Sequence, residues 1–181
     1  MVIGITGTTG AGKDTIADYL KTLGFAYHSL SDIIRDECAK KNIPLDRDNL
    51  IAMGNELRGK LGPGVLGKLT AEKIQNLGET KAIAVSIRNP AEVAELKKMP
   101  GFFLISVDAP IDIRYNRIKT RGRIEDSVTF EKFKAQEETE LAGSANQQQL
   151  NNVMTLADFR IKNDETFENL HRRVDEILKK T

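Results

Sequence analysis

Residues 7–15, GTTGAGKDT, combine three glycines and a lysine at a spacing that suits phosphate chemistry. Glycines let the backbone take conformations forbidden to other residues, so successive amide groups can point inward at a polyphosphate. Lys13 adds a mobile positive charge. A glycine-rich turn that binds nothing is the alternative, but the run stands at the first turn between a strand and a helix, where the helix dipole favours bound phosphate. The predicted phosphate contacts are Gly7, Thr8, Thr9, Gly10, Ala11, Gly12, Lys13, Asp14 and Thr15.

The residue after Lys13 departs from the usual form of this loop, in which a Ser or Thr hydroxyl reaches Mg²⁺. This chain has Asp14 in that place. A carboxylate is itself a hard oxygen ligand, and the hydroxyl of Thr15 follows it, so we predict Asp14 and Thr15 as the metal-binding pair. The alternative role of Asp14 is that of an acidic residue in the first helical turn, where it stabilises the helix through the dipole.

Short apolar runs alternate with amphipathic stretches along the whole chain. VIGIT, at residues 2–6, is apolar and β-branched, as in a buried parallel strand. Similar short runs lie at residues 25–29, 81–87, 102–109 and 158–163, and stretches with helical spacing separate them. Parallel strands require right-handed crossovers that carry helices. The pattern therefore predicts an α/β fold with a five-stranded parallel sheet and helices on both faces.

Composition sets outer limits on the class of protein. A length of 181 residues fits one domain, at the usual ~100–200 residues per domain. Lys and Arg number 27 against 26 Asp and Glu, so the net charge of +1 gives no drive toward nucleic acid or an anionic membrane. Cys38 is the only cysteine, which excludes an internal disulfide and a Cys-rich zinc site. No run approaches the ~18 apolar residues of a membrane span, so we expect a single cytoplasmic domain over residues 1–181.

With these motifs together, the chain resembles the P-loop kinases of the nucleoside monophosphate kinase superfamily, in particular those with the G-K-D form of the Walker A loop. The resemblance covers nearly the whole chain. It implies the three-layer P-loop NTPase fold with a helical acceptor-binding insertion, about residues 31–78, and a short lid, about residues 117–128. It also implies ATP as phosphate donor, Mg²⁺, a small nucleotide-like acceptor, and a monomer or weak homo-oligomer.

Three segments resemble the acceptor side of these kinases. HSLSDIIRDE is similar to the segment after the second strand of adenylate kinases, which implies acceptor contacts by Asp32 and Arg35. GNELRGKLGPGVL resembles an acceptor-side helix and implies Arg58, and VSIRNPAEVAEL resembles the end of the third strand and implies Arg88. Planar guanidinium groups suit phosphates. Ordinary solvated or ion-paired arginines on helix surfaces are the alternative.

Two further segments resemble the donor side. RYNRIKTRGRIED is similar to the lid and implies that Arg117, Arg121 and Arg123 approach the phosphates. A solvated basic face or a nucleic-acid patch is the alternative, and the scarcity of nearby aromatic residues argues against nucleic acid. ADFRIKND is similar to the last strand, which implies that Asn163 lies near the donor adenine. The implied catalytic residues are Lys13, Asp32, Arg88, Arg117, Arg121 and Arg123.

The acceptor is left open between two classes. A phosphate acceptor is already a nucleophile at neutral pH, so Asp32 would orient a nucleoside monophosphate, and the acceptor-side arginines favour this reading. In dephospho-coenzyme A kinases, which the same segment also resembles, Asp32 would be the general base for a hydroxyl. Many relatives carry an acidic residue at the end of the third strand, where this chain has Val85 and Ser86. That departure keeps a third reading, a nucleotide-binding regulatory protein without catalysis.

One charged run falls outside these motifs. EETE, at residues 137–140, lies in a stretch with helical spacing that contains many charged residues. We interpret it as a solvated helix face.

Overall fold

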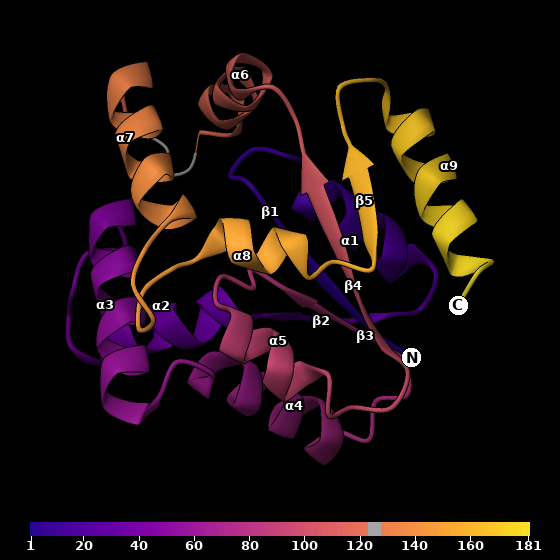
Figure 1. Ribbon diagram of the computed structural model, residues 1–181, viewed down its shortest axis with the longest axis horizontal. Helices are drawn as coiled ribbons and strands as arrows, with labels where there is room; N and C mark the ends of the chain where they lie inside the picture. Colours follow the sequence, from indigo (N-terminus) through magenta and orange to yellow (C-terminus); the bar gives the residue numbers. More distant parts are fainter. Residues whose placement is uncertain (123–127) are drawn as a thin grey trace.

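A parallel sheet of five strands forms the centre of the molecule (Figure 1). The computed structural model describes residues 1–122 and 128–181. Within them the strands are β1 (Val2–Gly7), β2 (Ala26–Ser29), β3 (Ala82–Val85), β4 (Phe102–Asp108) and β5 (Phe159–Lys162). Their order across the sheet is β2-β3-β1-β4-β5, and every neighbouring pair is parallel. The predicted α/β fold with a five-stranded parallel sheet is confirmed.

The most apolar strands occupy the middle of the sheet. All residues of β1 and β3 are buried, as expected for strands covered on both faces. In register, Val2 of β1 lies between Ala82 of β3 and Phe102 of β4. Gly4 has no room for a side chain, because a Cβ there would stand 2.7 Å from the ring of Phe102. The sequence of β1 therefore fits the centre of the sheet and delivers the loop at residues 7–15 there.

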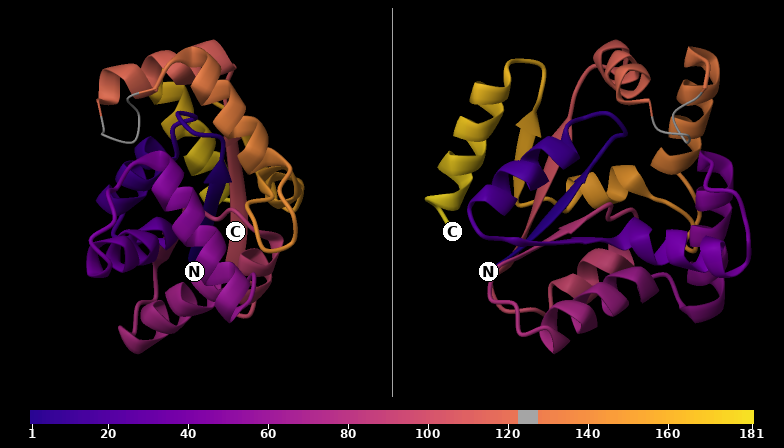
Figure 2. Two further views of the ribbon diagram at one scale, coloured as in Figure 1. Left: turned by 90° about the vertical axis from the view of Figure 1, so that its left-hand side faces the viewer. Right: turned by 180° about the vertical axis from the view of Figure 1, so that it is seen from behind.

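Helices cover both faces of the sheet (Figure 2). They are α1 (Lys13–Thr22), α2 (Leu30–Lys40), α3 (Arg47–Leu61), α4 (Val65–Asn76), α5 (Pro90–Leu96), α6 (Ile111–Arg121), α7 (Phe130–Leu141), α8 (Leu150–Thr155) and α9 (Phe167–Leu178). On one face, Ile16 and Leu20 of α1 and Leu170 and Val174 of α9 form a core with β1 and β4. On the other face, side chains of α2, α4, α5 and α8 form a second core. The stretches with helical spacing that were predicted to separate the strands are occupied by these helices.

The strand order reverses direction beside β1. From β1 the chain continues to β2 on one side of the sheet, whereas from β4 it continues to β5 on the other side. In open parallel sheets, such a reversal leaves a crevice at the carboxyl ends of the two strands, and ligands bind there. The loop at residues 7–15 follows the carboxyl end of β1, so the fold places it at this crevice.

Helices α3 and α7 lie next to each other at one side of the molecule, and α6 lies beside α7 (Figure 1). Asp48 of α3 accepts a hydrogen bond of 2.6 Å from Gln136 of α7 and pairs with Lys132 at 3.0 Å. The lid expected at about residues 117–128 begins in the last turns of α6. Residues 123–127, with the predicted lid residue Arg123, lie outside the described residues. No helix in the described part of the chain is both long and apolar enough to cross a membrane.

A buried carboxylate ties the end of β3 to α3 and α5. Glu92 is fully buried, and its Oε1 accepts a hydrogen bond of 2.9 Å from Arg58 Nε and forms an ion pair with Arg58 Nη2 at 2.8 Å. Its Oε2 accepts from the backbone amides of Arg88, at 2.8 Å, and Asn89, at 3.0 Å. One side chain therefore fixes both the helix that carries Arg58 and the turn that carries Arg88.

Replacing Glu92 by Gln is expected to destabilise the fold by about 3–5 kcal/mol, because it leaves the Arg58 charge buried without a counter-charge. Urea unfolding followed by circular dichroism measures the change. Glu95→Gln is the matched control on the same helix: Glu95 pairs with Lys98 at 2.6 Å on the surface, so its loss should leave the unfolding midpoint unchanged. Equal effects of the two substitutions would contradict the assigned role of Glu92.

Candidate active site

A cavity of about 340 Å³ opens over the loop at residues 7–15. Its lining combines the loop with residues of α2, α3, α6 and α7, the turn after β3, and the turn after β5. Among the described residues, its basic lining side chains are Lys13, Arg35, Arg47, Arg58, Arg88, Arg117 and Arg121, and its carboxylates are Asp14 and Glu140. Seven basic side chains facing two carboxylates favour an anionic ligand in this cavity.

The loop has the backbone geometry that its glycines predict. Gly10 has a φ of 81° and Gly12 a φ of 102°, both in the region that favours glycine. The Lys13 ammonium folds back over the loop and donates to the carbonyls of Gly7, at 2.9 Å, and Thr8, at 2.6 Å. Burial, reinforced by the nearby Arg88 guanidinium, holds the pKa of Lys13 well below its ordinary value. A bound polyphosphate would favour the charged form of Lys13 and draw its ammonium off the carbonyls.

Contacts from distant parts of the chain hold the loop in place. Asn163, after β5, donates a hydrogen bond of 2.8 Å to the carbonyl of Ala11. The Thr8 hydroxyl donates to Asp108 at 2.5 Å, and Arg114 donates to the carbonyl of Thr9 at 3.2 Å. Asn163, predicted near the donor base, thus lines the cavity and also supports the loop.

The predicted metal pair, Asp14 and Thr15, lines the same cavity as Lys13. The Asp14 carboxylate is half-exposed and lies 3.3 Å from Arg121, so the predicted lid arginine already approaches the loop. The described residues contain no group of three or more His, Cys, Asp or Glu side chains that could hold a metal by themselves. One carboxylate fits Mg²⁺, which usually keeps several waters and is bound through one or two carboxylates together with substrate phosphates.

The three predicted acceptor arginines come together at the cavity. Arg35, Arg58 and Arg88 all line it, from α2, α3 and the turn after β3. Arg58 is only 1% exposed, and its Nη1 has no hydrogen-bond partner in the part of the chain that the structure describes. Arg88 donates to the carbonyl of Gly7 at 3.2 Å, which brings it against the phosphate loop. These three side chains, far apart in sequence, therefore share one cavity with Lys13.

Asp32 lies apart from this group. Its side chain is exposed on α2, 3.4 Å from Arg35, and it is not among the residues that line the cavity. The lid residues Arg117 and Arg121 do line the cavity, and Arg117 donates to the carbonyl of Asn163 at 3.2 Å. An acid or base role for Asp32 would require α2 to move toward the phosphate loop.

The interpretation of residues 137–140 as a solvated helix face holds for Glu138 and Thr139 but is wrong for Glu137 and Glu140. Glu137 and Glu140 are buried, 7% and 4% exposed, and face basic side chains instead of solvent. Glu137 binds Arg114 through both carboxylate oxygens. Glu140 binds Arg47, which the sequence analysis did not single out. A signal was present: Phe133, Gln136, Glu137 and Glu140 lie at i, i+3, i+4 and i+7, so they form one helix face.

The sequence analysis also did not single out Phe167 and Gln148, which line the cavity. Phe167, at the start of α9, is 68% exposed and lines the cavity beside Asn163. An exposed aromatic ring at the rim of a cavity offers a surface on which a flat base can stack. The side chain of Gln148 has a buried Oε1 without a partner in the described residues, which leaves an acceptor for a ligand N–H or O–H group.

Comparison with known proteins identifies the family of this chain. The sequence pattern that defines a family of AAA domains matches residues 3–140. A UPF0200 protein of Pyrococcus abyssi is 34% identical over 99% of this chain and 96% of its own length. The chain belongs to the UPF0200 family and to this family of AAA domains.

Solved structures share the UPF0200 fold. TT1252 from Thermus thermophilus is 21% identical, with a TM-score of 0.67 over 99% of this chain and 97% of its own. A shikimate kinase from Bacteroides thetaiotaomicron is 16% identical, with a TM-score of 0.60 over 99% of this chain and 98% of its own. The UPF0200 chain therefore has the P-loop NTPase fold that small-molecule kinases use.

The loop geometry of the UPF0200 chain predicts that Gly12→Ala is damaging. A Cβ at Gly12 would lie 2.3 Å from Asn163 Nδ2, and its φ of 102° strains any other residue. We expect a loss of about 1–3 kcal/mol of unfolding free energy, measured by urea titration. Gly59→Ala is the control, since no atom lies within 4 Å of that position on α3 and alanine favours a helix. Equal stability of the two variants would contradict the tight packing of the loop against Asn163.

Proposed function

We propose that this UPF0200 protein is an ATP-dependent phosphotransferase that acts on a small nucleotide-like acceptor, namely a nucleoside or deoxynucleoside monophosphate. The observation that carries the proposal is the single cavity that holds Lys13 and the phosphate loop together with Arg35, Arg58 and Arg88. Phosphoryl transfer depends mainly on positioning and on electrostatic stabilisation of the moving group. The shared fold with a shikimate kinase supports kinase chemistry and leaves the acceptor open.

The donor would lie on the loop with its base toward α9. The amides of the loop and the Lys13 ammonium bind its phosphates, where the dipole of α1 also favours negative charge. Phe167 stacks on the base from the rim. Arg117 donates to the carbonyl of Asn163, which lines the same cavity. Asn163 holds the loop from below through its bond to Ala11. Arg121 and Arg123 would approach the phosphates from the lid and exclude water.

Asp14 and Thr15 would hold Mg²⁺. When bound, the ion screens the charge of the donor phosphates. Because Arg121 pairs with Asp14, the lid arginine must exchange that carboxylate for phosphate oxygens when the donor arrives. Asp14 thus keeps Arg121 at the loop until a more highly charged partner replaces it.

The transfer step needs no base when the acceptor is a phosphate. An acceptor phosphate oxygen attacks the γ-phosphorus of ATP, the bond from that phosphorus to the β–γ bridging oxygen breaks, and ADP leaves with the bond's electrons. Arg88 borders both the loop and the acceptor side, so it would stabilise charge on the transferred group. Arg35 and Arg58 would bind the acceptor, with Arg58 Nη1 as an available donor.

A monophosphate acceptor is favoured over the hydroxyl of dephospho-coenzyme A by the place of Asp32. A hydroxyl acceptor requires a general base within hydrogen-bond reach. Asp32 is exposed on α2 and does not line the cavity. Its role in this proposal is to orient Arg35, its neighbour at 3.4 Å.

The reaction is tested by incubating the purified protein with Mg²⁺-ATP and a panel of ribo- and deoxynucleoside monophosphates and dephospho-coenzyme A. We expect a nucleoside diphosphate, identified by mass, from at least one monophosphate. Formation of coenzyme A instead would make the acceptor a hydroxyl and require α2 to move Asp32 inward. Nucleotide binding without acceptor-dependent turnover would contradict the kinase proposal and favour a regulatory role.

Lys13→Ala is expected to lower acceptor-dependent turnover at least about 100-fold, because it removes the cation nearest the transferred phosphate. The fold should persist, since Lys13 bonds only to carbonyls of its own loop in the described residues. Lys21→Ala on the same helix is the control: Lys21 pairs with Asp18 at 2.6 Å on the surface, so full turnover is expected. Unchanged turnover in Lys13→Ala would remove the active-site assignment.

Phe167→Ala is expected to raise the KM for ATP about tenfold, since stacking of a base on an aromatic ring contributes about 1–3 kcal/mol, and to leave kcat nearly unchanged. Steady-state kinetics with varied ATP measures both constants. Leu77→Ala, at a leucine that is 59% exposed and distant from the cavity, should change neither. A KM equal to that of the wild type would place the base elsewhere.

A further inference from the structure

Two arginines converge on one carboxylate and one hydroxyl beside the phosphate loop. Glu140 Oε1 lies 3.0 Å from Arg47 Nε and 2.7 Å from Arg47 Nη2, and Glu140 Oε2 lies 3.5 Å from Arg88 Nη1. The hydroxyl of Thr9, within the loop, accepts from Arg47 at 3.3 Å and from Arg88 at 3.4 Å. Two oxygens of one carboxylate thus bridge two guanidinium groups, as two oxygens of a phosphate would.

The donors around Glu140 exceed what its carboxylate uses. The Arg47 side chain is 8% exposed, yet its Nη1 has no partner in residues 1–122 and 128–181. Arg47, Arg88 and Glu140 all line the cavity. Leaving a buried guanidinium N–H without an acceptor is costly unless a ligand completes it. The unused donor Arg47 Nη1 could therefore bind a further oxygen of an anion that has more oxygens than a carboxylate.

Docking of α7 does not explain Glu140. The helix is already held by Glu137, which binds Arg114 through both oxygens, and by the buried ring of Phe133. The guanidinium carbons of Arg47 and Arg114 lie 5.3 Å and 5.9 Å from the centre of that ring. Glu137 does not line the cavity, whereas Glu140 does. The two glutamates therefore differ: Glu137 holds α7 against α6, whereas Glu140 faces the cavity.

We propose that Arg47, Arg88 and Thr9 form a phosphate-binding subsite, that Glu140 is its internal ligand, and that the phosphate of the acceptor displaces Glu140. The assignment of this phosphate to the acceptor rests on the proposed function; the subsite itself does not. Without its carboxylate, the cations Lys13, Arg47 and Arg88 would face one another in a buried space. Glu140 neutralises part of this charge in the empty protein, so an incoming anion must bind the arginines more strongly than the Glu140 carboxylate does. A doubly charged phosphate can displace the carboxylate, whereas an uncharged hydroxyl compound cannot.

The ionisation of Glu140 agrees with this role. Burial alone would raise the pKa of Glu140, but the guanidiniums of Arg88 and Arg47 hold that pKa below its ordinary value. The carboxylate therefore stays charged at neutral pH and competes with any incoming anion. Lys13 adds to the same effect from the loop.

Inorganic phosphate tests the subsite without any nucleotide. Isothermal titration calorimetry at neutral pH measures its affinity for the wild type, Glu140→Gln and the double variant Glu140→Gln/Arg47→Gln. We expect Glu140→Gln to bind phosphate at least tenfold more tightly than the wild type, and the double variant to lose that gain. The phosphate loop is present in all three proteins, and loss of the gain in the double variant would assign that gain to Arg47.

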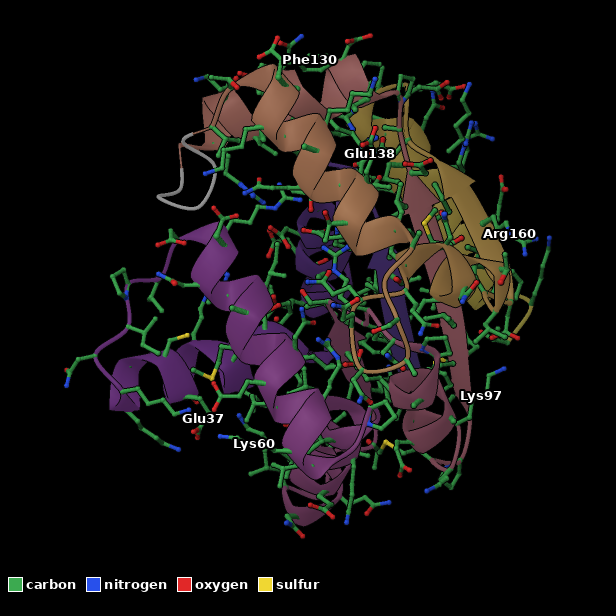
Figure 3. All side chains as sticks on the ribbon, turned by 60° about the vertical axis from the view of Figure 1, so that its left-hand side comes forward. Glu37, Lys60, Lys97, Phe130, Glu138 and Arg160 are labelled. Atoms are coloured by element: carbon green, nitrogen blue, oxygen red, sulfur yellow. The ribbon has the colours of Figure 1, made fainter. Side chains whose placement is uncertain are left out.

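Glu138→Gln is the matched control, because Glu138 lies exposed on the same helix (Figure 3). The substitution removes the same charge from α7 as Glu140→Gln does. Its phosphate affinity should equal that of the wild type. If Glu140→Gln binds phosphate no more tightly than Glu138→Gln, or if the gain survives loss of Arg47, the proposal is overturned. If Glu140→Gln fails to fold, Glu140→Asp replaces it, because it keeps the charge but shortens the side chain. We expect Glu140→Asp to bind phosphate a few-fold more tightly than the wild type. An unchanged phosphate affinity in this variant overturns the proposal as well.

The same variant separates this proposal from the kinase proposal. If the acceptor panel yields a product, Glu140→Gln should lower the KM for the monophosphate several-fold, because the acceptor no longer competes with a carboxylate. A tighter phosphate affinity in a protein without acceptor turnover would support the subsite and contradict the proposed function. Turnover in the panel, with a KM and a phosphate affinity that Glu140→Gln leaves unchanged, would support the proposed function and contradict the subsite.

Discussion

The concentration of positive charge around the loop at residues 7–15 is the constraint on which the rest of the structure depends. Lys13, Arg47, Arg58 and Arg88 line one cavity, and Arg47 and Arg58 are only 7% and 1% exposed. Buried cations need counter-charges at close range, because water no longer screens them. The fold supplies these from different helices: Glu92 of α5 binds Arg58, and Glu140 of α7 bridges Arg47 and Arg88.

These pairs also assemble the molecule around the cavity. Glu92 uses its second oxygen on the backbone amides of residues 88 and 89, so the turn after β3 and helix α3 share one anchor. On the other side, Glu137 binds Arg114, and Arg114 in turn donates to the carbonyl of Thr9 in the loop. The backbone of the phosphate loop is therefore connected through side chains to α6 and α7. Any ligand that changes the charge in the cavity acts directly on the helices that form its walls.

The sequence predicted the sheet, the helices and the loop because these depend on local patterns. The apolar runs of β1 and β3 and the spacing of Gly7, Gly10 and Gly12 need no knowledge of the tertiary structure. Arg47 and Glu140 could not be paired in this way, since 93 residues separate them and each resembles an ordinary surface charge. The acidic run was misread because burial of Glu137 and Glu140 depends on arginines from α3 and α6. Asp32 was assigned through resemblance, and its exposed place follows from the orientation of α2.

The costly features of the structure gather at this cavity. Of the six buried side-chain atoms without a partner in the described residues, Arg47 Nη1, Arg58 Nη1 and Gln148 Oε1 belong to residues that line it. Ser86, another lining residue, has a φ of 65°, a conformation that non-glycine residues seldom take. Both faces of the sheet, by contrast, are packed with apolar side chains. Unpaired polar atoms and a strained turn persist where a ligand can compensate them, because each costs free energy in the empty protein. Their coincidence with the phosphate loop therefore argues for a ligand-binding role independently of the loop motif itself.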